Sequence, residues 1–472
     1  MGGSRRSPPA EPVPVESGPA GRLRSAVASA LAGALPDGGT VAVALSGGRD
    51  SIALLDAALA SARAAGVRIV AIHVHHGLSA SADRWSAFCA DTCATLGVDV
   101  AIRHVQVRRT PRASTEALAR EARYAALADA ARRCGATAVL LAHHADDQAE
   151  TLLLQLLRGA GPRGLAAMPP SQSDQGILWL RPFLALPRAD IDACVAELGL
   201  AFVEDESNAQ PAHRRNALRL RVVPPLREIA AGYPRTLVRA ARLQAEAARL
   251  ADDLAQIDAE GACDAHGLDR AALAGLPGRR SRNLLRWFLR ERGLPAPSAA
   301  RLAEMLRQLC APGASPTLRI AHAGFEVSIH HGRVVVHEPP LAPYARELDG
   351  DAIELPHGSL TFAAGRGEGI ATRHFADSHV SIRAGIPGER LLPAGRGVRR
   401  AVADLLREAG VPHWERRALP RVYCGDRLAA VATLGVDAAF AAGPGEPGMV
   451  PDWRPAVPAA AAGRRPPGSV VL

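Results

Sequence analysis

A short loop of small and polar residues lies between two apolar runs in ALSGGRDSIALL, residues 44–55. Adjacent glycines let the backbone approach a ligand closely, and a helix that begins after them turns its free N–H groups towards an anion. Asp50 would repel a bare phosphate, so its presence indicates a bound cation between the two, as in a magnesium-bound nucleotide. We therefore predict a phosphate-binding loop at residues 46–51. The alternative is an ordinary glycine turn with a capping aspartate.

Two other phosphate-loop types are excluded by their context. A Walker loop requires a lysine, and every basic residue of this chain other than histidine is an arginine. RGAGPRGL (158–165) has the GxGxxG spacing of a dinucleotide-binding turn, but it follows a predicted helix rather than a strand. We interpret that segment as a glycine-rich turn at the C-terminal end of a helix.

A second polar cluster, AHHADDQAET (142–151), ends another predicted buried strand. Asp147 and Glu150 stand three residues apart, so both carboxylates can share one helix face and bind a single hard cation. The alternative is a capping acid pair with a solvated glutamate. Asp50 at the neighbouring strand end favours the functional interpretation. HVHHGL (73–78) closes a further strand, and its histidines are candidates for an adenine pocket.

Arginines near these segments are candidate phosphate ligands. EALAREARYAAL (116–127) places Arg120 where it can reach polyphosphate, while Arg123 fits a surface pair equally well. Four more arginines surround Asn216 in the segment 202–226, where the alternatives are phosphate contacts and a solvated charge run. They are Arg214, Arg215, Arg219 and Arg221.

Alternating apolar segments and helices predict the architecture that positions these residues. Buried strands are expected at 40–45, 67–75, 99–107 and 137–144. Helical segments separate them, which indicates an α/β fold with a doubly wound, mostly parallel sheet. Ligands bind beyond the carboxyl ends of the strands in such sheets. SGG, HVHHG and AHHADD all fall at such strand ends.

Composition changes along the chain predict further domains. We expect a catalytic domain at 22–226, a mostly helical domain at 227–340 with a hairpin turning at His331-Gly332, and a small C-terminal α/β domain at 379–445. The remaining segments are predicted to be disordered tails or a linker with weak strands. They are residues 1–21, 341–378 and 446–472.

Bulk properties limit the class of protein. The chain has 472 residues, 48% of them hydrophobic, and no apolar run long enough to span a membrane, so no membrane partner is expected. Residues 22–36 are interpreted as a first amphipathic helix rather than a signal peptide. Seven scattered cysteines indicate a reducing, cytoplasmic setting. The net charge of +9 is compatible with a polyanionic partner.

The ordered motifs resemble a known family. SGGRDS resembles the loop of the N-type (PP-loop) ATP pyrophosphatases, which cleave ATP to AMP and pyrophosphate. Other segments stand in the order and spacing of one branch of it, the tRNA(Ile)-lysidine synthases: HVHHGLSASAD, LAREARY, AHHADDQAETLLLQLLRGAGPRGLAAM, RPFL, EDESN and RRNALRLRVVPPL. The resemblance is dense over about residues 22–226 and looser beyond.

The resemblance implies a reaction and its partners. ATP would adenylate the wobble cytidine of the CAU anticodon in tRNA(Ile), and free L-lysine would then displace AMP to give lysidine. The helical and C-terminal domains would hold the tRNA. The oligomeric state stays open, with a homodimer as one option.

The resemblance also implies site residues. Catalytic roles fall to Asp50, Asp147, Glu150, Arg120 and Arg215, and the three carboxylates among them would also bind magnesium. ATP would be bound by Ser46, Gly47, Gly48, Arg49, Asp50, Ser51 and His75.

Two other functions fit the loop less well. A tRNA thiolase would require paired cysteines near the site, and Cys89, Cys93 and Cys134 lack such spacing. A non-catalytic nucleotide or RNA-binding module would not require the three carboxylates together.

Overall fold

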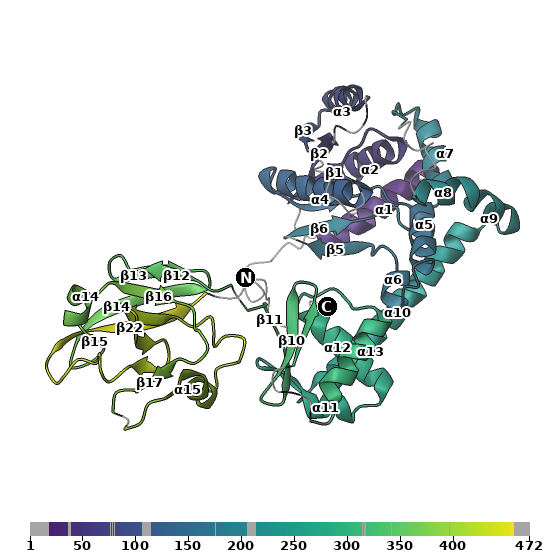
Figure 1. The fold of residues 1–472 in the computed structure, drawn as a ribbon. Helices are drawn as coiled ribbons and strands as arrows, with labels where there is room; N and C mark the ends of the chain where they lie inside the picture. Colours follow the sequence, from purple (N-terminus) through teal and green to yellow (C-terminus); the bar gives the residue numbers. More distant parts are fainter. Residues whose placement is uncertain are drawn as a thin grey trace, which may run out of the picture. The chain divides into compact units, whose positions relative to one another are not determined.

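A computed structural model describes the chain over residues 18–35, 39–75, 77, 79, 81–105, 115–174, 176–204, 214–313, 315, 318–340, 342–395 and 397–456. It divides into two compact units, residues up to 250 and residues from 251 onwards, and each is described by itself (Figure 1).

The first unit is built on a six-stranded sheet with the order β3-β2-β1-β4-β6-β5. Its strands are β1 (Gly39–Ala44), β2 (Val67–His75), β3 (Asp99–His104), β4 (Ala136–Leu140), β5 (Ser171–Asp174) and β6 (Ile177–Leu180). All neighbouring pairs are parallel except β5 with β6. The predicted doubly wound, mostly parallel sheet is therefore confirmed. The sequence did not predict β5 and β6, which extend the sheet beyond β4.

Helices cover both faces of this sheet. Its helices are α1 (Pro19–Ala34), α2 (Arg49–Ala65), α3 (Ala82–Leu96), α4 (Thr115–Arg133), α5 (Ala145–Leu156), α6 (Pro162–Leu165), α7 (Arg188–Leu198), α8 (Arg214–Arg221) and α9 (Val223–Ile229). One core joins α1, α2, α3 and α7 to the sheet, and a second joins α4 to the opposite face. The expected first helix is α1, which buries Leu23, Val27 and Leu31.

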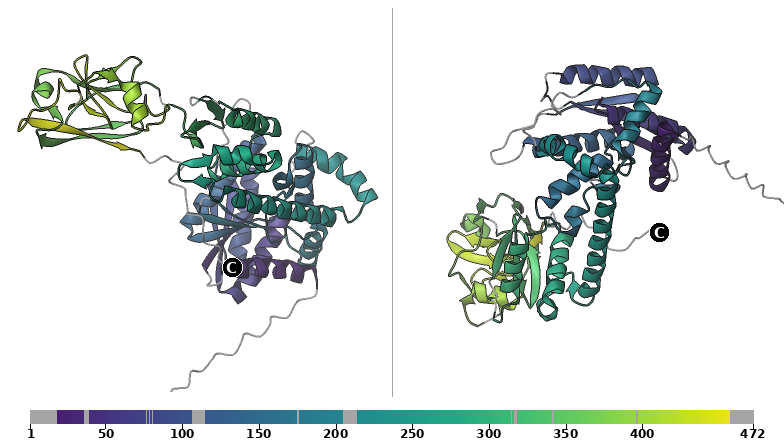
Figure 2. Two further views of the ribbon diagram at one scale, coloured as in Figure 1. Left: turned by 90° about the horizontal axis from the view of Figure 1, so that it is seen from below. Right: turned by 90° about the vertical axis from the view of Figure 1, so that its right-hand side faces the viewer.

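A smaller core holds α5 against the helices that follow the sheet. Ala149 of α5 packs with Leu218 of α8, Val223 of α9 and Tyr233. Tyr233 begins α10 (Tyr233–Ala259), which runs as one continuous helix (Figure 2). This core sets the distance between α5 and α8, which carry most of the charged residues predicted to act.

In the second unit, three helices pack on an antiparallel sheet with the order β7-β8-β11-β10-β9. The elements are β7 (Cys263–Asp264), β8 (Gly267–Asp269), α11 (Arg270–Gly275), α12 (Gly278–Glu291), α13 (Ala299–Cys310), β9 (Arg319–His322), β10 (Phe325–His330) and β11 (Arg333–His337). The hairpin predicted to turn at His331-Gly332 is the β10–β11 pair, and both turn residues have positive φ, 45° and 75°.

The C-terminal elements form two further antiparallel sheets, β12-β16-β19-β20-β21 and β13-β14-β22-β15, with a two-stranded pair beside them. They are β12 (Ala345–Glu347), β13 (Ala352–Leu355), β14 (Gly358–Arg366), β15 (Ile370–Ala371), α14 (Arg373–Asp377), β16 (Val380–Arg383), β17 (Arg390–Leu391), β18 (Arg400–Ala401), α15 (Val402–Glu408), β19 (Arg421–Cys424), β20 (Arg427–Val431), β21 (Gly435–Val436) and β22 (Pro447–Pro455). The expected domain of helices and strands is present, and its described strands all pair antiparallel.

Three predicted boundaries are wrong. The expected tail at 1–21 overlaps α1, which begins at Pro19 and buries Ala20. The expected linker at 341–378 contributes β12 to β15, and its Leu360 and Phe362 are buried in the domain core. The expected tail at 446–472 begins with β22, which pairs with β14 along its whole length. Residues 457–472, like residues 1–17 of the predicted N-terminal tail, lie outside the described part of the chain.

Candidate active site

The predicted loop and the predicted acidic cluster lie at adjacent strand ends. β1 and β4 are hydrogen-bonded neighbours, and the chain leaves them in opposite directions, towards β2 and towards β6. This is the topological switch point of the sheet, where doubly wound folds bind their ligands. The segment SGGRDS follows β1, and HHADD follows β4.

Hydrogen bonds between its two serines hold the loop in shape. The Ser51 hydroxyl accepts from the Ser46 N–H at 3.2 Å and donates to the Gly48 carbonyl at 2.8 Å. The two hydroxyl oxygens lie 3.0 Å apart. No side chain caps α2, and the N–H groups of Ser51 and Ile52 donate to the Gly48 carbonyl at 3.0 Å and 3.1 Å. A helix N-terminus with free N–H groups is a binding site for an anion.

Gly47 is required where it stands. Its φ is +84°, and a Cβ there would meet Val203 Cγ2 at 3.0 Å and Cys89 Sγ at 3.1 Å. The Val203 N–H donates to the Gly47 carbonyl at 3.0 Å. A side chain at this position would therefore be strained and would push the loop away from Val203.

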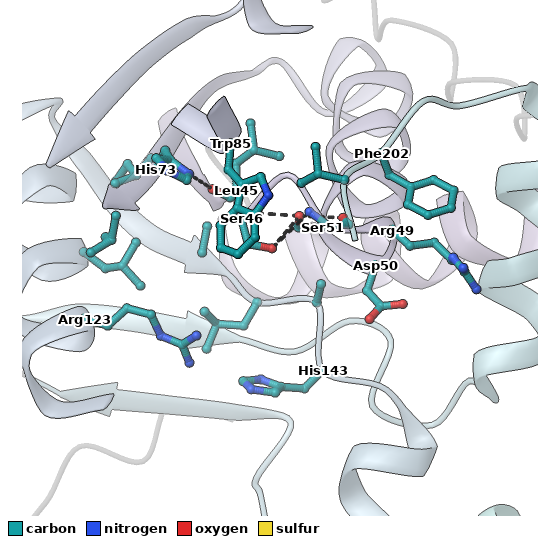
Figure 3. Close-up of a pocket in the computed structure, with 18 of the residues that line it drawn as sticks. Leu45, Ser46, Arg49, Asp50, Ser51, His73, Trp85, Arg123, His143 and Phe202 are labelled. Atoms are coloured by element: carbon teal, nitrogen blue, oxygen red, sulfur yellow. Dashed lines mark hydrogen bonds between the residues drawn. The ribbon is translucent and has the colours of Figure 1, made fainter. Parts of the chain in front are cut away.

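A cavity of about 720 Å³ opens in front of the loop. It is lined by the loop, the ends of β1, β2 and β4, and residues of α3 and α4. In Figure 3, the Asp50 carboxylate and the Arg123 guanidinium point into this space from opposite sides. Its size falls in the range of small-molecule sites. A nucleotide-sized ligand therefore fits here.

Asp50 presents a carboxylate oxygen without a partner. Among the described residues nothing hydrogen-bonds its buried Oδ1, while Oδ2 lies 3.7 Å from His144 Nε2. A buried acceptor with no donor is costly unless a ligand satisfies it. Asp50 lines the cavity, so its free oxygen is available to a cation carried by that ligand.

Arg49 is held by protein groups rather than pointing freely into the cavity. Its guanidinium donates to Asp192 at 2.6 Å and to Glu204 at 3.4 Å, and it lies over the Phe202 ring (Figure 3). It belongs to the cavity wall as expected. Its partners, however, tie the loop to α7 and to the segment around Val203.

Asp147 and Glu150 are bridged by two arginines of α8. Arg215 and Arg219 each direct Nε to Glu150, both at 2.6 Å. Each also directs Nη2 to Asp147 Oδ1, at 3.3 Å and 3.1 Å respectively. The structure thus brings together three predicted residues, Asp147, Glu150 and Arg215. It adds Arg219, which the sequence placed only in a run of arginines.

The three carboxylates do not all line the same cavity. Glu150 lines a second cavity of about 480 Å³, whereas Asp50 and Asp147 line the first. Within the described residues no group of three or more His, Cys, Asp or Glu side chains is placed to hold a metal ion. Asp50, with its free oxygen, fits the one-carboxylate coordination that magnesium uses with substrate phosphates. Glu150, with both oxygens bound by arginine, does not.

Of the remaining predicted residues, His75 lies in the first cavity and Arg120 does not. His75 lines it, and its Nε2 lies 2.9 Å from Asp83. Arg120 is exposed, lies over the Tyr124 ring and is not in the cavity wall. Arg123, which the sequence left between two interpretations, occupies the wall instead. It stands one helical turn from Arg120 on α4, and the helical spacing alone could not decide between them.

Two adjacent histidines have opposite electrostatic environments. Burial lowers the pKa of His143 to about 3, and the charges of Arg181 and Arg123 add to the effect, so this imidazole is neutral. Burial also acts to lower the pKa of His144. There, however, the nearby carboxylates of Asp50 and Asp147 outweigh it and raise the pKa above its usual value. The ring beside the carboxylates is therefore more basic than the neutral ring of His143, which lines the open cavity.

The same balance governs Asp147. Burial alone would raise its pKa, but the charges of His144 and Arg215 lower it below its usual range. Asp147 is therefore an anion at neutral pH. The site combines an anion-binding helix terminus, a cation-binding carboxylate and fixed ionic groups, which is an arrangement suited to chemistry on a nucleoside triphosphate.

Comparisons with known proteins are consistent with this geometry. Residues 23–226 match the PP-loop domain model, residues 268–335 the TilS substrate binding domain and residues 380–453 the TilS substrate C-terminal domain. The tRNA(Ile)-lysidine synthase of Ralstonia nicotianae is 40% identical over 92% of this chain and 96% of its own length. That of Nitrosomonas europaea is 37% identical over 89% and 92%. Among solved structures, a U34-tRNA thiolase from Methanococcus maripaludis matches 47% of this chain and 77% of its own, with 17% identity and a TM-score of 0.40.

Proposed function

The chain belongs to the tRNA(Ile)-lysidine synthase family, and we propose that it ligates L-lysine to carbon 2 of the wobble cytidine in the CAU anticodon of tRNA(Ile), consuming ATP. The observation that carries the proposal is the uncapped α2 terminus behind the Ser46–Ser51 loop, with the free oxygen of Asp50 beside it. This arrangement suits a triphosphate that arrives with a cation.

In the first half-reaction, the cytosine carbonyl oxygen attacks the α-phosphorus of ATP and pyrophosphate leaves. The carbonyl oxygen is a poor leaving group, so it must become an AMP ester before an amine can replace it. The loop and the first turn of α2 hold the departing pyrophosphate, and Arg123 supplies positive charge from the opposite wall. Magnesium held by Asp50 would neutralise part of the polyphosphate charge.

In the second half-reaction, the side-chain amine of lysine attacks carbon 2 and AMP leaves. The amine must first lose a proton, and an ionised carboxylate near the site is a suitable acceptor. Asp147 is buried, ionised and in the cavity wall, which also carries the carboxylates of Asp50 and Glu204. The nucleophile comes from solution, so a chain without lysine residues can perform this step.

The second unit supplies the proposed tRNA contacts. Two of its segments match substrate-binding domain models, and the net charge of the chain is +9. Positive charge contributes most of the affinity for a nucleic-acid backbone. None of the described helices is long and apolar enough to cross a membrane. We expect the enzyme to act in the cytoplasm, where tRNA, ATP and free lysine are present.

A thiolase function is disfavoured by the cysteines. Cys89 and Cys93, the pair nearest the loop, are fully buried, and burial raises the pKa of Cys89 to about 12 and that of Cys93 to about 11. Such thiols are weak nucleophiles at neutral pH. They are therefore poor carriers of sulfur.

The proposal is tested with the purified chain, magnesium-ATP, radiolabelled lysine and an unmodified tRNA(Ile) transcript with the CAU anticodon. We expect label in the tRNA, stoichiometric AMP and no label when ATP is omitted. A transcript with uridine in place of the wobble cytidine is the matched control and should stay unlabelled. ATP turnover on another RNA without lysine transfer to this one would contradict the proposal.

A further inference from the structure

Arg215 and Arg219 form a double bridge between α8 and α5. The two arginines are four residues apart on α8, and Asp147 and Glu150 are three apart on α5, so each pair shares a helix face. Both arginines use the same nitrogens in the same way, Nε for Glu150 and Nη2 for Asp147. Four charge-assisted hydrogen bonds therefore join two cations to two anions.

This bridge and the small apolar core beside it together hold α8 against α5. Eight residues are too few for a helix that is stable alone, and like charges four residues apart destabilise it further. Leu218 provides one apolar anchor against Ala149. The carboxylates of α5 neutralise the repulsion between the arginines. Without them, α8 would have no ionic reason to keep this orientation.

The bridge also determines where the carboxylates point. Asp147 is only 12% exposed at its side chain and Glu150 6%, so neither can exchange an arginine for water at low cost. Asp147 Oδ1 accepts from both arginines, while its Oδ2 accepts from the His144 N–H at 3.1 Å. Its orientation in the wall of the first cavity thus depends on both guanidinium groups.

Arg219 occupies a particular place in this arrangement. It lines the second cavity together with Glu150, yet it binds Asp147 in the wall of the first. We propose that Arg219 is a positioning residue of the ligation reaction, which acts by fixing the Asp147 and Glu150 carboxylates. This inference rests on the proposed function. A forked guanidinium spans two carboxylates, whereas the single ammonium of a lysine does not reach both in this geometry.

The test compares Arg219→Lys and Arg219→Gln in the full chain. We expect both variants to lower kcat for lysine attachment at least tenfold, with KM for tRNA within twofold of wild type. The positive charge of a lysine should not be enough for the reaction, so we expect Arg219→Lys to show the same loss of kcat as Arg219→Gln. The matched control is Arg133, which pairs with Asp129 at 3.0 Å on the surface of α4. Its Lys and Gln variants should stay within twofold of wild type.

Specific outcomes would overturn the inference. Wild-type kcat in Arg219→Lys would mean that only charge matters, and unchanged kcat per folded molecule in Arg219→Gln would mean a purely structural role. Should Arg219→Gln fail to fold, Arg219→Lys decides the question, because it keeps a cation beside Glu150. Wild-type protein that attaches no lysine would contradict the proposed function and this inference with it. If the wild-type protein attaches lysine and both Arg219 variants are equally active, only the inference about Arg219 is contradicted.

Discussion

The carbonyl of Gly47 accepts a hydrogen bond from the N–H of Val203 at 3.0 Å, which ties the phosphate loop to a segment beyond the last strand of the sheet. Arg49 strengthens this tie through Asp192, Glu204 and the Phe202 ring. The loop is therefore tied to a segment that lines the cavity with it. Its shape depends on these contacts with α7 and the segment 202–204.

Arg49→Gln tests whether this arginine holds the wall or binds ATP. Exposed ion pairs of this kind contribute about 0.2–1 kcal/mol each, so a wall role predicts a KM for ATP raised only a few fold. A direct phosphate contact predicts a much larger rise. Steady-state kinetics with varied ATP distinguish the two. Arg68→Gln, which breaks the exposed pair with Asp99, is the control and should leave KM unchanged.

Asp50→Asn is expected to abolish lysine attachment, because an amide cannot supply the anionic oxygen that a magnesium ion prefers. The measurement is lysine incorporation at several magnesium concentrations, with the unfolding temperature recorded for each protein. The control is Asp56→Asn on the same helix, where Asp56 pairs with Arg24 at 3.5 Å and is absent from the cavity wall. An active Asp50→Asn enzyme with unchanged magnesium dependence would remove Asp50 from the site.

The parallel sheet and the loop were predictable because their signals are local. TVAVA and VRIVAIHVH are runs of branched and small apolar residues, and SGGRDS stands between a strand and a helix. The polar edge strand SQSD has no such signal, and β5 was missed for that reason. β22 was missed because its prolines at 447, 451 and 455 suggested a tail. Spaced by four, they all fall on the same edge of the strand, and β22 still pairs along its whole length with β14.

The partners within the site were less predictable, because they are far apart in the chain. Asp147 and Glu150 formed a plausible metal pair by spacing alone. Only the fold places α8 against α5, so that Arg215 and Arg219 occupy those carboxylates. Choosing between Arg120 and Arg123 likewise required the position of α4 against the sheet.

His143 should make the enzyme sensitive to acid. Its pKa is lowered to about 3 by burial in the folded state, while the unfolded chain takes up the proton near pH 6.5. The folded state therefore loses stability as the pH falls from about 6.5 towards 3, by at most about 1.4 kcal/mol per pH unit. Above that window, the contribution is fully present.

The measurement is urea unfolding of wild type and His143→Gln at pH 7.5 and pH 5. Wild type should lose about 1–2 kcal/mol more than the variant over this interval, because the other histidines titrate equally in both. The variant His266→Gln, in which an exposed ring is removed, should behave as wild type. Equal pH dependence in wild type and His143→Gln would mean that His143 is protonated without cost in the folded protein.

Gly47→Ala separates backbone strain from close contact when it is compared with Gly66→Ala. Both glycines have positive φ, +84° and +62°, but a Cβ at Gly66 meets nothing within 4 Å, whereas one at Gly47 meets Val203 and Cys89. Gly66→Ala should therefore cost only the strain, about 1 kcal/mol of unfolding free energy, and keep full activity. Gly47→Ala should cost about 2–4 kcal/mol, since the contact adds to the strain.

Gly47→Ala should also weaken ATP binding, because the methyl group displaces the loop from the Val203 N–H. Denaturant unfolding and equilibrium ATP binding measure the two effects. Equal losses in both variants would mean that the loop tolerates the contact, and that Val203 does not determine the shape of the phosphate site.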